Sequence, residues 1–335
     1  MRRLSVFLMS ATLSCMLIGG KASPISASAS EVAVYVGGMS AGFTLKTDGA
    51  QIIALSEVLT ESGKCAPASD AGLRVGDVIQ KAGGIRIGSI SELNEVVNKS
   101  QGKELAIEVL RGGEVIPFCL RAVQEKTSSK YKMGVLVREN ISGIGTVTYI
   151  NKETGDFGAL GHSVVGENQQ ILQISSGAVY ECSIVGVCKG VRGKAGELRG
   201  MFLNDKQFGS AEKLCDCGIF GKVSQEFAVD GLQQAVASSN DVKPGRAYIY
   251  STVNGVSPEK YEIEIVKVDK FNRENKNFVV KISDEGLISE TGGIVQGMSG
   301  SPILQNGRLV GAITHVFLND PTRGYGIDIE RMLQE

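Results

Sequence analysis

The amino-acid sequence predicts a mainly β protein with a small helical share (α+β), built from two folded segments. Glycine is abundant and proline is scarce, 43 residues against 7, which is typical of chains with many tight turns between short strands. Short runs with alternating apolar residues recur along the chain, whereas few stretches have helical periodicity. A length of 335 residues suffices for about two domains, each with its own hydrophobic core.

Composition excludes two classes of protein. The hydrophobic share of 42% is ordinary for a globular chain, so a wholly disordered protein is excluded. The net charge is −1 and basic residues never run beyond two in a row. A nucleic-acid partner is therefore not expected, because such proteins carry a concentrated basic surface.

Residues 1–30 have the features of an export signal or an N-terminal membrane anchor. They begin with Met1-Arg2-Arg3, continue with an apolar run from Leu4 to Ile18, and include Ala27-Ser28-Ala29, which is typical of a signal-peptidase site. The apolar run is shorter than the roughly 20 residues that a spanning helix usually needs. We therefore expect the rest of the chain to be exported, extracytoplasmic and membrane-associated, where disulfides are permitted.

Residues 31–124 are predicted to form one domain of short strands and a single clear helix. Ser89 or Ser91 is suited to cap that helix, which has apolar residues on one face. The alternating runs 104–110 and 115–120 then predict a hairpin.

The phrase Gly72-Leu73-Arg74-Val75-Gly76-Asp77-Val78-Ile79, with the order of the elements around it, resembles a PDZ domain. In PDZ domains a glycine-rich loop offers backbone N–H groups to a peptide carboxylate, and the peptide adds as a strand. By this resemblance Gly42, Phe43, Thr44 and Leu45 are expected to line the peptide-binding groove. The alternative is a groove that serves only as an internal contact.

The polar stretch 125–132 lacks periodicity and is predicted to be a linker. Beyond it, residues 133–335 alternate short apolar runs with glycine-rich turns, which is typical of a β-sandwich or barrel. Helical patterns in this segment are limited to 209–214 and 330–334.

The most informative phrase in the second segment is Gly297-Met298-Ser299-Gly300-Ser301-Pro302. It resembles the Gly-x-Ser-Gly-Gly-Pro nucleophile turn of chymotrypsin-like peptidases, and a hairpin follows it as in that fold. The N–H groups of Gly297 and Ser299 are then expected to form an oxyanion hole. Because the phrase lies between strands and not at a strand-to-helix turn, an α/β-hydrolase is disfavoured. A Gly/Ser-rich structural turn is the alternative.

A nucleophilic serine needs a base, and the chain has only two histidines. His162 ends an apolar run in a small-residue turn early in the segment, where chymotrypsin-like enzymes present their base. His315 ends the strand after the nucleophile hairpin, where that fold places the substrate cleft. We therefore predict His162 as the general base and His315 as a residue of the substrate cleft.

The acid that would orient the base stays open when the residues alone are considered. The candidates are Asp156, Asp205, Asp230, Asp241 and Asp284.

Six cysteines follow the signal segment. Cys182, Cys188, Cys215 and Cys217 form a conceivable zinc set, but the Cys-x-Cys spacing fits zinc knuckles poorly. We predict no metal site and no cofactor, and the pairing of the cysteines stays open.

Three longer phrases, at 154–162, 291–302 and 314–326, resemble the sporulation stage IV B peptidase family. That family joins a signal-anchor, a PDZ domain and a peptidase domain. The resemblance therefore implies a PDZ domain followed by a chymotrypsin-like double β-barrel over 133–335.

The family's catalytic triad, placed on matching positions, implies His162, Asp284 and Ser299. The expected role of Asp284 is to hold the tautomer of the imidazole, and Asp156 is the second candidate for it. Met298 stands where trypsin-like enzymes have an aspartate, so activation by a newly cut N-terminus is not available to this chain.

The same resemblance implies a function. The protein is expected to be a serine endopeptidase in the space between the two forespore membranes, which cuts itself in trans. It is then expected to cleave the extracytoplasmic part of a membrane-bound regulator (stage IV FA) that restrains pro-sigma-K processing. Its implied partners are a protein substrate, a second copy and a peptide ligand of the PDZ domain. The alternatives are a PDZ adaptor with a non-catalytic peptidase-like domain, and an exported quality-control protease.

Overall fold

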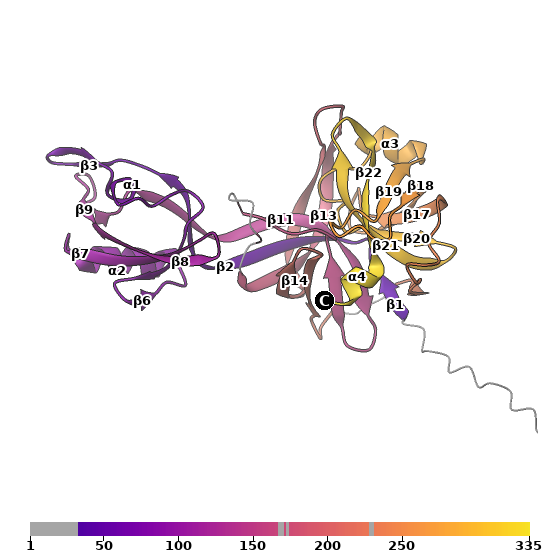
Figure 1. The fold of residues 1–335 in the computed structure, drawn as a ribbon, viewed down its shortest axis with the longest axis horizontal. Coiled ribbons are helices and arrows are strands. Elements are labelled where there is room, and N and C mark those ends of the chain that lie inside the picture. The colour runs from indigo at the N-terminus through magenta and orange to yellow at the C-terminus, as the bar shows by residue number, and fades with distance from the viewer. Residues whose placement is uncertain (1–32, 167–170, 172–173, 228–230) are drawn as a thin grey trace, which may run out of the picture. The chain divides into compact units, whose positions relative to one another are not determined.

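The computed structural model describes residues 33–166, 171, 174–227 and 231–335 (Figure 1). The predicted export segment, residues 1–30, lies outside the described residues. Within the described part, no helix is long and apolar enough to cross a bilayer.

Strands that precede and follow the PDZ segment in the sequence form a first barrel. Its pairings run β11-β12-β15-β14-β13-β2, and β2 also pairs with β11, so the cycle is closed. β1 and β16 extend the same sheet. The strands are β1 (Ala33–Val36), β2 (Ser40–Leu55), β11 (Val135–Asn151), β12 (Asp156–Ala159), β13 (Ile174–Cys188), β14 (Glu197–Cys215), β15 (Gly218–Val223) and β16 (Gln233–Ala235).

A second closed barrel follows, with the order β17-β18-β19-β22-β21-β20. Alternate residues along each strand point inward and form its core, as the burial of Ala247, Ile249, Ile263 and Ile265 shows. Its elements are β17 (Gly245–Ser251), β18 (Glu259–Val268), β19 (Phe278–Ile282), α3 (Glu285–Thr291), β20 (Pro302–Gln305), β21 (Arg308–Phe317), β22 (Asp320–Asp328) and α4 (Ile329–Leu333).

The PDZ segment has a core of its own, in which Ile79, Leu93 and Ile107 are fully buried. A buried ion pair between Asp77 and Arg111, at 2.6 Å, ties the loop before β5 to the end of β7. The elements are β3 (Val58–Thr60), β4 (Gly63–Cys65), α1 (Pro67–Asp70), β5 (Val78–Ala82), β6 (Ile85–Arg86), α2 (Ile90–Ser100), β7 (Glu104–Arg111), β8 (Glu114–Arg121), β9 (Val123–Gln124) and β10 (Tyr131–Lys132).

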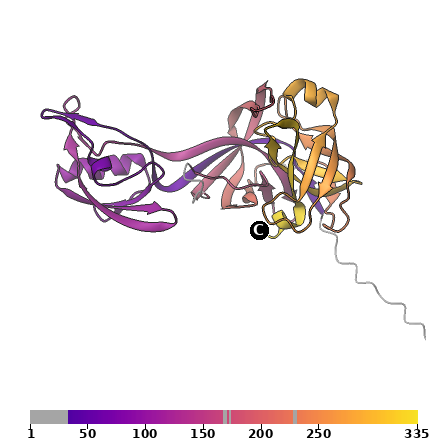
Figure 2. The ribbon, with the colours of Figure 1, turned by 45° about the horizontal axis from the view of Figure 1, so that its top comes forward.

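The fold is therefore mainly β, with a PDZ domain and a chymotrypsin-like pair of barrels, as predicted. The strand pairings do not follow the predicted boundary at residue 124, however. Residues 40–46 pair with 140–146 in the first barrel, whereas residues 51–55 pair with 135–138 in the PDZ segment. The PDZ segment is thus inserted between two strands of the peptidase barrel, and β2 and β11 run side by side through both parts (Figures 1 and 2).

The two long strands change register where they pass from one part to the other. Arg138 pairs with Gln51 and Asn140 pairs with Lys46, so the four residues 47–50 of β2 face the single residue Glu139. The carboxylate of Glu139 accepts a hydrogen bond from the N–H of Ile90, 2.6 Å away, at the start of α2. Thr47 still pairs with Ile174 of the first barrel and Ala50 pairs with Ile79 of β5, so β2 passes from one part to the other within this bulge.

Several predicted elements are confirmed, and three differ. Ser89, not Ser91, caps α2, and its hydroxyl accepts from the N–H of Glu92 at 3.1 Å. Residues 209–214, predicted as a helix, lie within strand β14 because they pair with both β13 and β15. The stretch 125–132, predicted as a linker, is mostly the turn of the β9–β10 hairpin. Helix α3 was not predicted.

Candidate active site

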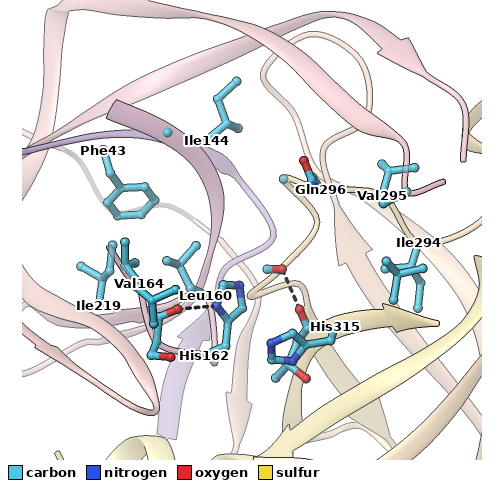
Figure 3. A pocket seen from close by; sticks show the side chains of 18 of the residues that line it. Phe43, Ile144, Leu160, His162, Val164, Ile219, Ile294, Val295, Gln296 and His315 are labelled. Atoms are coloured by element: carbon cyan, nitrogen blue, oxygen red, sulfur yellow. Dashed lines mark hydrogen bonds between the residues drawn. The ribbon is translucent and has the colours of Figure 1, made fainter. Parts of the chain in front are cut away.

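His162 and Ser299 line one cavity of about 520 Å³ (Figure 3). Most of the other lining side chains are apolar. They come from both barrels, and include Phe43, Leu45, Ile144, Leu160, Val164, Ile219, Ile294, Val295 and Val316. The two residues that the sequence analysis assigned to nucleophile and base therefore meet in one apolar cavity.

Ser299 is presented by a tight loop that requires glycine at positions 297 and 300. Gly297 and Gly300 have φ angles of 100° and 95°, in the region that favours glycine. A Cβ on Gly300 would lie 2.0 Å from the carbonyl oxygen of Thr146. Met298, between the glycine and the serine, points inward and is fully buried. The loop is fixed by packing on one side and by close backbone contact on the other.

Two buried threonines of β11 hold this loop, and the sequence analysis did not identify them. Thr146 Oγ1 donates to the carbonyl of Gly297 at 2.8 Å, and Thr148 Oγ1 donates to the carbonyl of Gly300 at 2.8 Å. The N–H of Thr146 also donates to the carbonyl of Ser299 at 2.9 Å. The pattern Thr-x-Thr on a strand, with both hydroxyls on one face, was the available signal.

The predicted oxyanion hole has free donors. In the described part of the chain, the N–H groups of Gly297 and Ser299 donate to no other residue. The carbonyl of Gly297 is held by Thr146, which fixes the Gly297–Met298 peptide group that lies between the two donors. Such free N–H groups are suited to bind the oxygen of a tetrahedral intermediate.

His162 follows the end of β12 through a turn of two residues with positive φ. Leu160 and Gly161 have φ angles of 71° and 69°. A Cβ on Gly161 would lie 2.9 Å from Ile327 Cγ2 and 3.1 Å from Thr314 Cγ2, so the turn is packed against the second barrel. This packing brings the imidazole to the boundary of the two barrels, where Ser299 also lies.

The imidazole of His162 has a defined tautomer. Its Nδ1 lies 2.8 Å from the carbonyl oxygen of Ser163, which can only accept, so Nδ1 carries the proton. Nε2 is left as the basic nitrogen. Burial lowers the pKa of His162 below its ordinary value, and the Ser163 carbonyl opposes this shift more weakly. A neutral imidazole with a free Nε2 is the form that a general base requires.

The hydroxyl of Ser299 donates to the carbonyl oxygen of Thr314 at 2.7 Å (dashed in Figure 3). It is therefore not hydrogen-bonded to His162 in this conformation. Catalytic hydrogen bonds are often absent from ligand-free sites and form with the substrate. The proton of Ser299 must leave this carbonyl before His162 can take it.

His315 stands beside His162 in the same cavity. The two ring centroids are 4.9 Å apart and the ring planes are tilted by 42°. Burial first, and then the charges of His162 and Lys276, lower the pKa of His315 to about 4. Both imidazoles are consequently neutral near pH 7.

Asp284 lies outside the set of residues that line the cavity. Its carboxylate caps α3, with Oδ1 accepting from the N–H of Leu287 at 2.9 Å. Asp156, the second candidate, is at the start of β12 and pairs with Lys222. Neither carboxylate contacts His162 in this structure, and the carbonyl of Ser163 occupies Nδ1 instead.

The structure does not support the peptide-binding assignment of Gly42, Phe43, Thr44 and Leu45. Each of them is paired on both sides, with β11 and with β13. A peptide cannot add as a strand, because no edge is open. Phe43 and Leu45 line the cavity of His162 and Ser299 instead.

The six described cysteines are free thiols. Cys182 pairs with Phe202 and Cys188 with Glu197, in the first part of β14. Cys215 ends that strand and pairs with Gly218 across the turn to β15. The four cysteines considered as one zinc set therefore do not come together as a set.

Comparison with known proteins identifies the family. The model of the SpoIVB peptidase S55 family matches residues 129–333, more than half of the chain. The chain belongs to the SpoIVB peptidase S55 family. A PDZ domain model matches residues 41–120. The predicted family resemblance is confirmed, and the S55 match with the nucleophile loop supports a serine peptidase.

One curated relative is similar to only part of this S55 peptidase. The zinc metalloprotease RasP of Shouchella clausii is 31% identical over 125 residues, which are 35% of this chain and 30% of RasP. The chain thus matches less than a third of the length of this relative.

Two solved structures are similar to parts of the chain. The Rv3671c protease of M. tuberculosis, in an inactive form, has 15% identity, covers 57% of this chain and 81% of its own, and has a TM-score of 0.34. The PDZ domain of the SdrC-like protein of Listeria monocytogenes has 19% identity, covers 27% and 87%, and has a TM-score of 0.22. Because these scores are low, the fold described above rests on the strand pairings of this chain.

Proposed function

We propose that this S55 peptidase is a serine endopeptidase in which Ser299 is the nucleophile and His162 the general base. The observation that carries the proposal is the shared cavity, with a neutral imidazole whose Nε2 is free beside a serine on a glycine-rich loop.

In the proposed reaction, His162 Nε2 takes the proton of Ser299 while Oγ bonds to the substrate carbonyl carbon. The N–H groups of Gly297 and Ser299 stabilise the resulting oxyanion, at about 3 kcal/mol per donor. The imidazolium then protonates the leaving amine as the C–N bond breaks. Water attacks the acyl-enzyme in the same way, and the proton returns to Ser299.

The orienting group in this scheme has two candidates. The family resemblance supports Asp284, whereas the geometry around Nδ1 supports the carbonyl of Ser163, which already fixes the tautomer. His315 is neutral and adjacent, so it contributes a wall of the cavity and not a counter-charge.

We propose that the substrate places an apolar side chain in the cavity. Phe43, Leu45, Ile219 and Val295 are among the side chains that line it, and apolar surface removed from water there contributes about 25 cal/mol per Å². A library of peptides that differ at one residue tests this proposal. Equal cleavage of apolar and charged variants contradicts it.

Membership of the S55 family supports the finer proposal. The protein is exported, cuts itself in trans near its N-terminus, and then cleaves the extracytoplasmic segment of a membrane-bound regulator in sporulation signalling. We place it in the space between the forespore membranes. The PDZ domain, through a surface other than Gly42 to Leu45, binds a peptide segment of a second copy or of the substrate.

A fluorophosphonate probe tests the peptidase proposal, because labelling requires an activated serine. We expect label on the wild type, none on Ser299→Ala, and a loss of at least a hundredfold in rate on His162→Ala. Absent or unchanged labelling favours the alternative of a non-catalytic PDZ adaptor.

Mass spectrometry of the mature N-terminus, compared between wild type and Ser299→Ala, tests self-cleavage. A narrow set of cleaved peptides supports signalling. Broad digestion of unfolded proteins favours the alternative of a quality-control protease.

A further inference from the structure

A second cluster of reactive side chains lies at the turn between β14 and β15, outside the cavity. Cys215 ends β14, Asp216 and Cys217 form the two-residue turn, and Glu335 follows α4. One ligand atom from each of the four residues lies within 4.8 Å of the other three. Segments more than a hundred positions apart in the sequence thus converge on one point.

We propose that Cys215, Asp216, Cys217 and Glu335 bind one zinc ion. Zinc in structural sites takes four ligands at tetrahedral corners, with Zn–S near 2.3 Å and Zn–O of about 2.0–2.2 Å, which places the ligand atoms roughly 3.3–3.8 Å apart. In this structure the four ligand atoms lie within 4.8 Å of one another, so the largest separation must shorten by about 1 Å when zinc binds. Two thiolates with two carboxylates favour zinc over hard cations such as magnesium or calcium.

Two hydrogen bonds hold the turn in place. The N–H of Cys217 donates to Cys215 Sγ at 3.3 Å, which stabilises a thiolate at position 215. The side-chain amide of Asn275 donates to the carbonyl of Asp216 at 2.6 Å. Such contacts around the ligands orient them before the metal arrives.

Charge balance agrees with a divalent ion. Lys213 Nζ lies 2.6 Å from Glu335 Oε2, and Arg331 lies 3.9 Å from Asp216 Oδ2. Each of the two carboxylates thus has a cation within 4 Å. Exchange of two thiol protons for Zn²⁺ leaves the local charge unchanged.

The site would brace the turn that supports His162. Gly218 directly follows Cys217, and a Cβ on it would lie 2.2 Å from the carbonyl oxygen of Ala159 and 3.1 Å from the nitrogen of Gly161. The same ion would join this hairpin to the end of the chain segment after α4. Its role is therefore structural, and the proposal does not depend on the peptidase activity.

The test is zinc binding by the reduced full-length protein, measured by competition with a chromogenic chelator and by metal analysis after dialysis. We expect one zinc per chain and a rise in the thermal midpoint on addition of Zn²⁺. Cys217→Ser and Cys215→Ser should each lose the site, and Glu335→Gln should weaken it about tenfold. Cys119→Ser, an exposed cysteine of β8, is the matched control and should bind as the wild type does.

Three results would overturn the proposal. One is a reduced wild type that binds no zinc. Another is a Cys215→Ser/Cys217→Ser double variant, folded by circular dichroism, that binds as much zinc as the wild type. The third is a protein isolated without reductant that carries a Cys215–Cys217 disulfide, seen as a loss of about 2 Da, and takes up no zinc after reduction.

Discussion

At the residue scale, the environment of His162 determines the pH range in which the base is available. Burial disfavours the imidazolium, so its pKa lies below the ordinary 6.5. As the pH falls, the neutral form therefore persists to more acidic values than in a free histidine.

We predict that the rate of fluorophosphonate labelling rises with pH through a midpoint below 6.5 and is constant above about pH 7. The profile of His315→Gln is the control, because His315 titrates near 4. A midpoint above 6.5, or one that disappears with His315, contradicts the assignment of the base.

Thr146 is predicted to control the oxyanion hole through the Gly297 carbonyl. Thr146→Val keeps the shape of the side chain but leaves that buried carbonyl without its donor, which costs about 1–3 kcal/mol of stability. We expect a lower kcat with a smaller change in KM, and recovery in Thr146→Ser. Denaturant unfolding and steady-state kinetics on one peptide give both quantities. Equal loss in the serine variant would point to packing and not to the hydrogen bond.

That Ser299 and His162 share one cavity could be predicted from the sequence, because a short motif and a choice between two histidines were sufficient. The contact of His162 Nδ1 with Ser163 could not, since it is made by a backbone carbonyl, which every residue has. Phe43 and Leu45 were assigned to the wrong surface, because a glycine-rich strand start resembles a PDZ loop whether or not its edges are paired.

At the scale of the element, Asp284 is the N-cap of α3, and its role as the orienting acid stays a prediction. Asp284 begins this helix, and Gly292 ends it with a φ angle of 77°. These two end signals are readable in the sequence, but the helix between them has only 7 residues, which is about two turns. Part of strand β14 was predicted as a helix because residues 209–214 have a helix-compatible composition. Pairing with strands on both sides makes them a strand instead.

Two substitutions of Asp284 separate its possible roles. Asparagine caps helices as well as aspartate does, so Asp284→Asn should retain stability, whereas Asp284→Ala should lose about 0.5–2 kcal/mol. If Asp284 only caps α3, kcat of Asp284→Asn stays near that of the wild type. If it orients His162 during turnover, we expect a loss that approaches the 10⁴-fold seen when a triad acid becomes an amide. Thermal unfolding and kcat decide between them.

At the scale of the whole molecule, the insertion of the PDZ segment into the barrel could not be predicted from sequence order. Local patterns identify strand residues, but they do not mark where β2 and β11 pass from the barrel to the PDZ segment, and only the pairing shows that each strand serves both parts. The fold class of each part was nevertheless predictable, because its turns and motifs are local.

Two deletions test this architecture. Removal of 31–124 takes away β1 and β2, so we expect the first barrel to unfold and labelling of Ser299 to be lost. Replacement of 48–138 by Asn-Gly joins Thr47 to Glu139, next to the paired residues Lys46 and Asn140, through a two-residue hairpin turn. We expect this shorter protein to fold and to retain the fluorophosphonate label. Labelling of the first protein, or unfolding of the second with the first intact, contradicts the insertion.

The bulge at Glu139 makes the PDZ segment an exchangeable cassette. In an uninterrupted ladder, one added residue turns every later side chain to the opposite face. Here regular strand pairing begins again at Asn140, which pairs with Lys46. A change of length on the PDZ side of the bulge therefore leaves the alternation of side chains at Phe43 and Leu45 unchanged. Recognition modules of different sizes can therefore be grafted between positions 47 and 140 while the walls of the hydrolytic chamber keep their places.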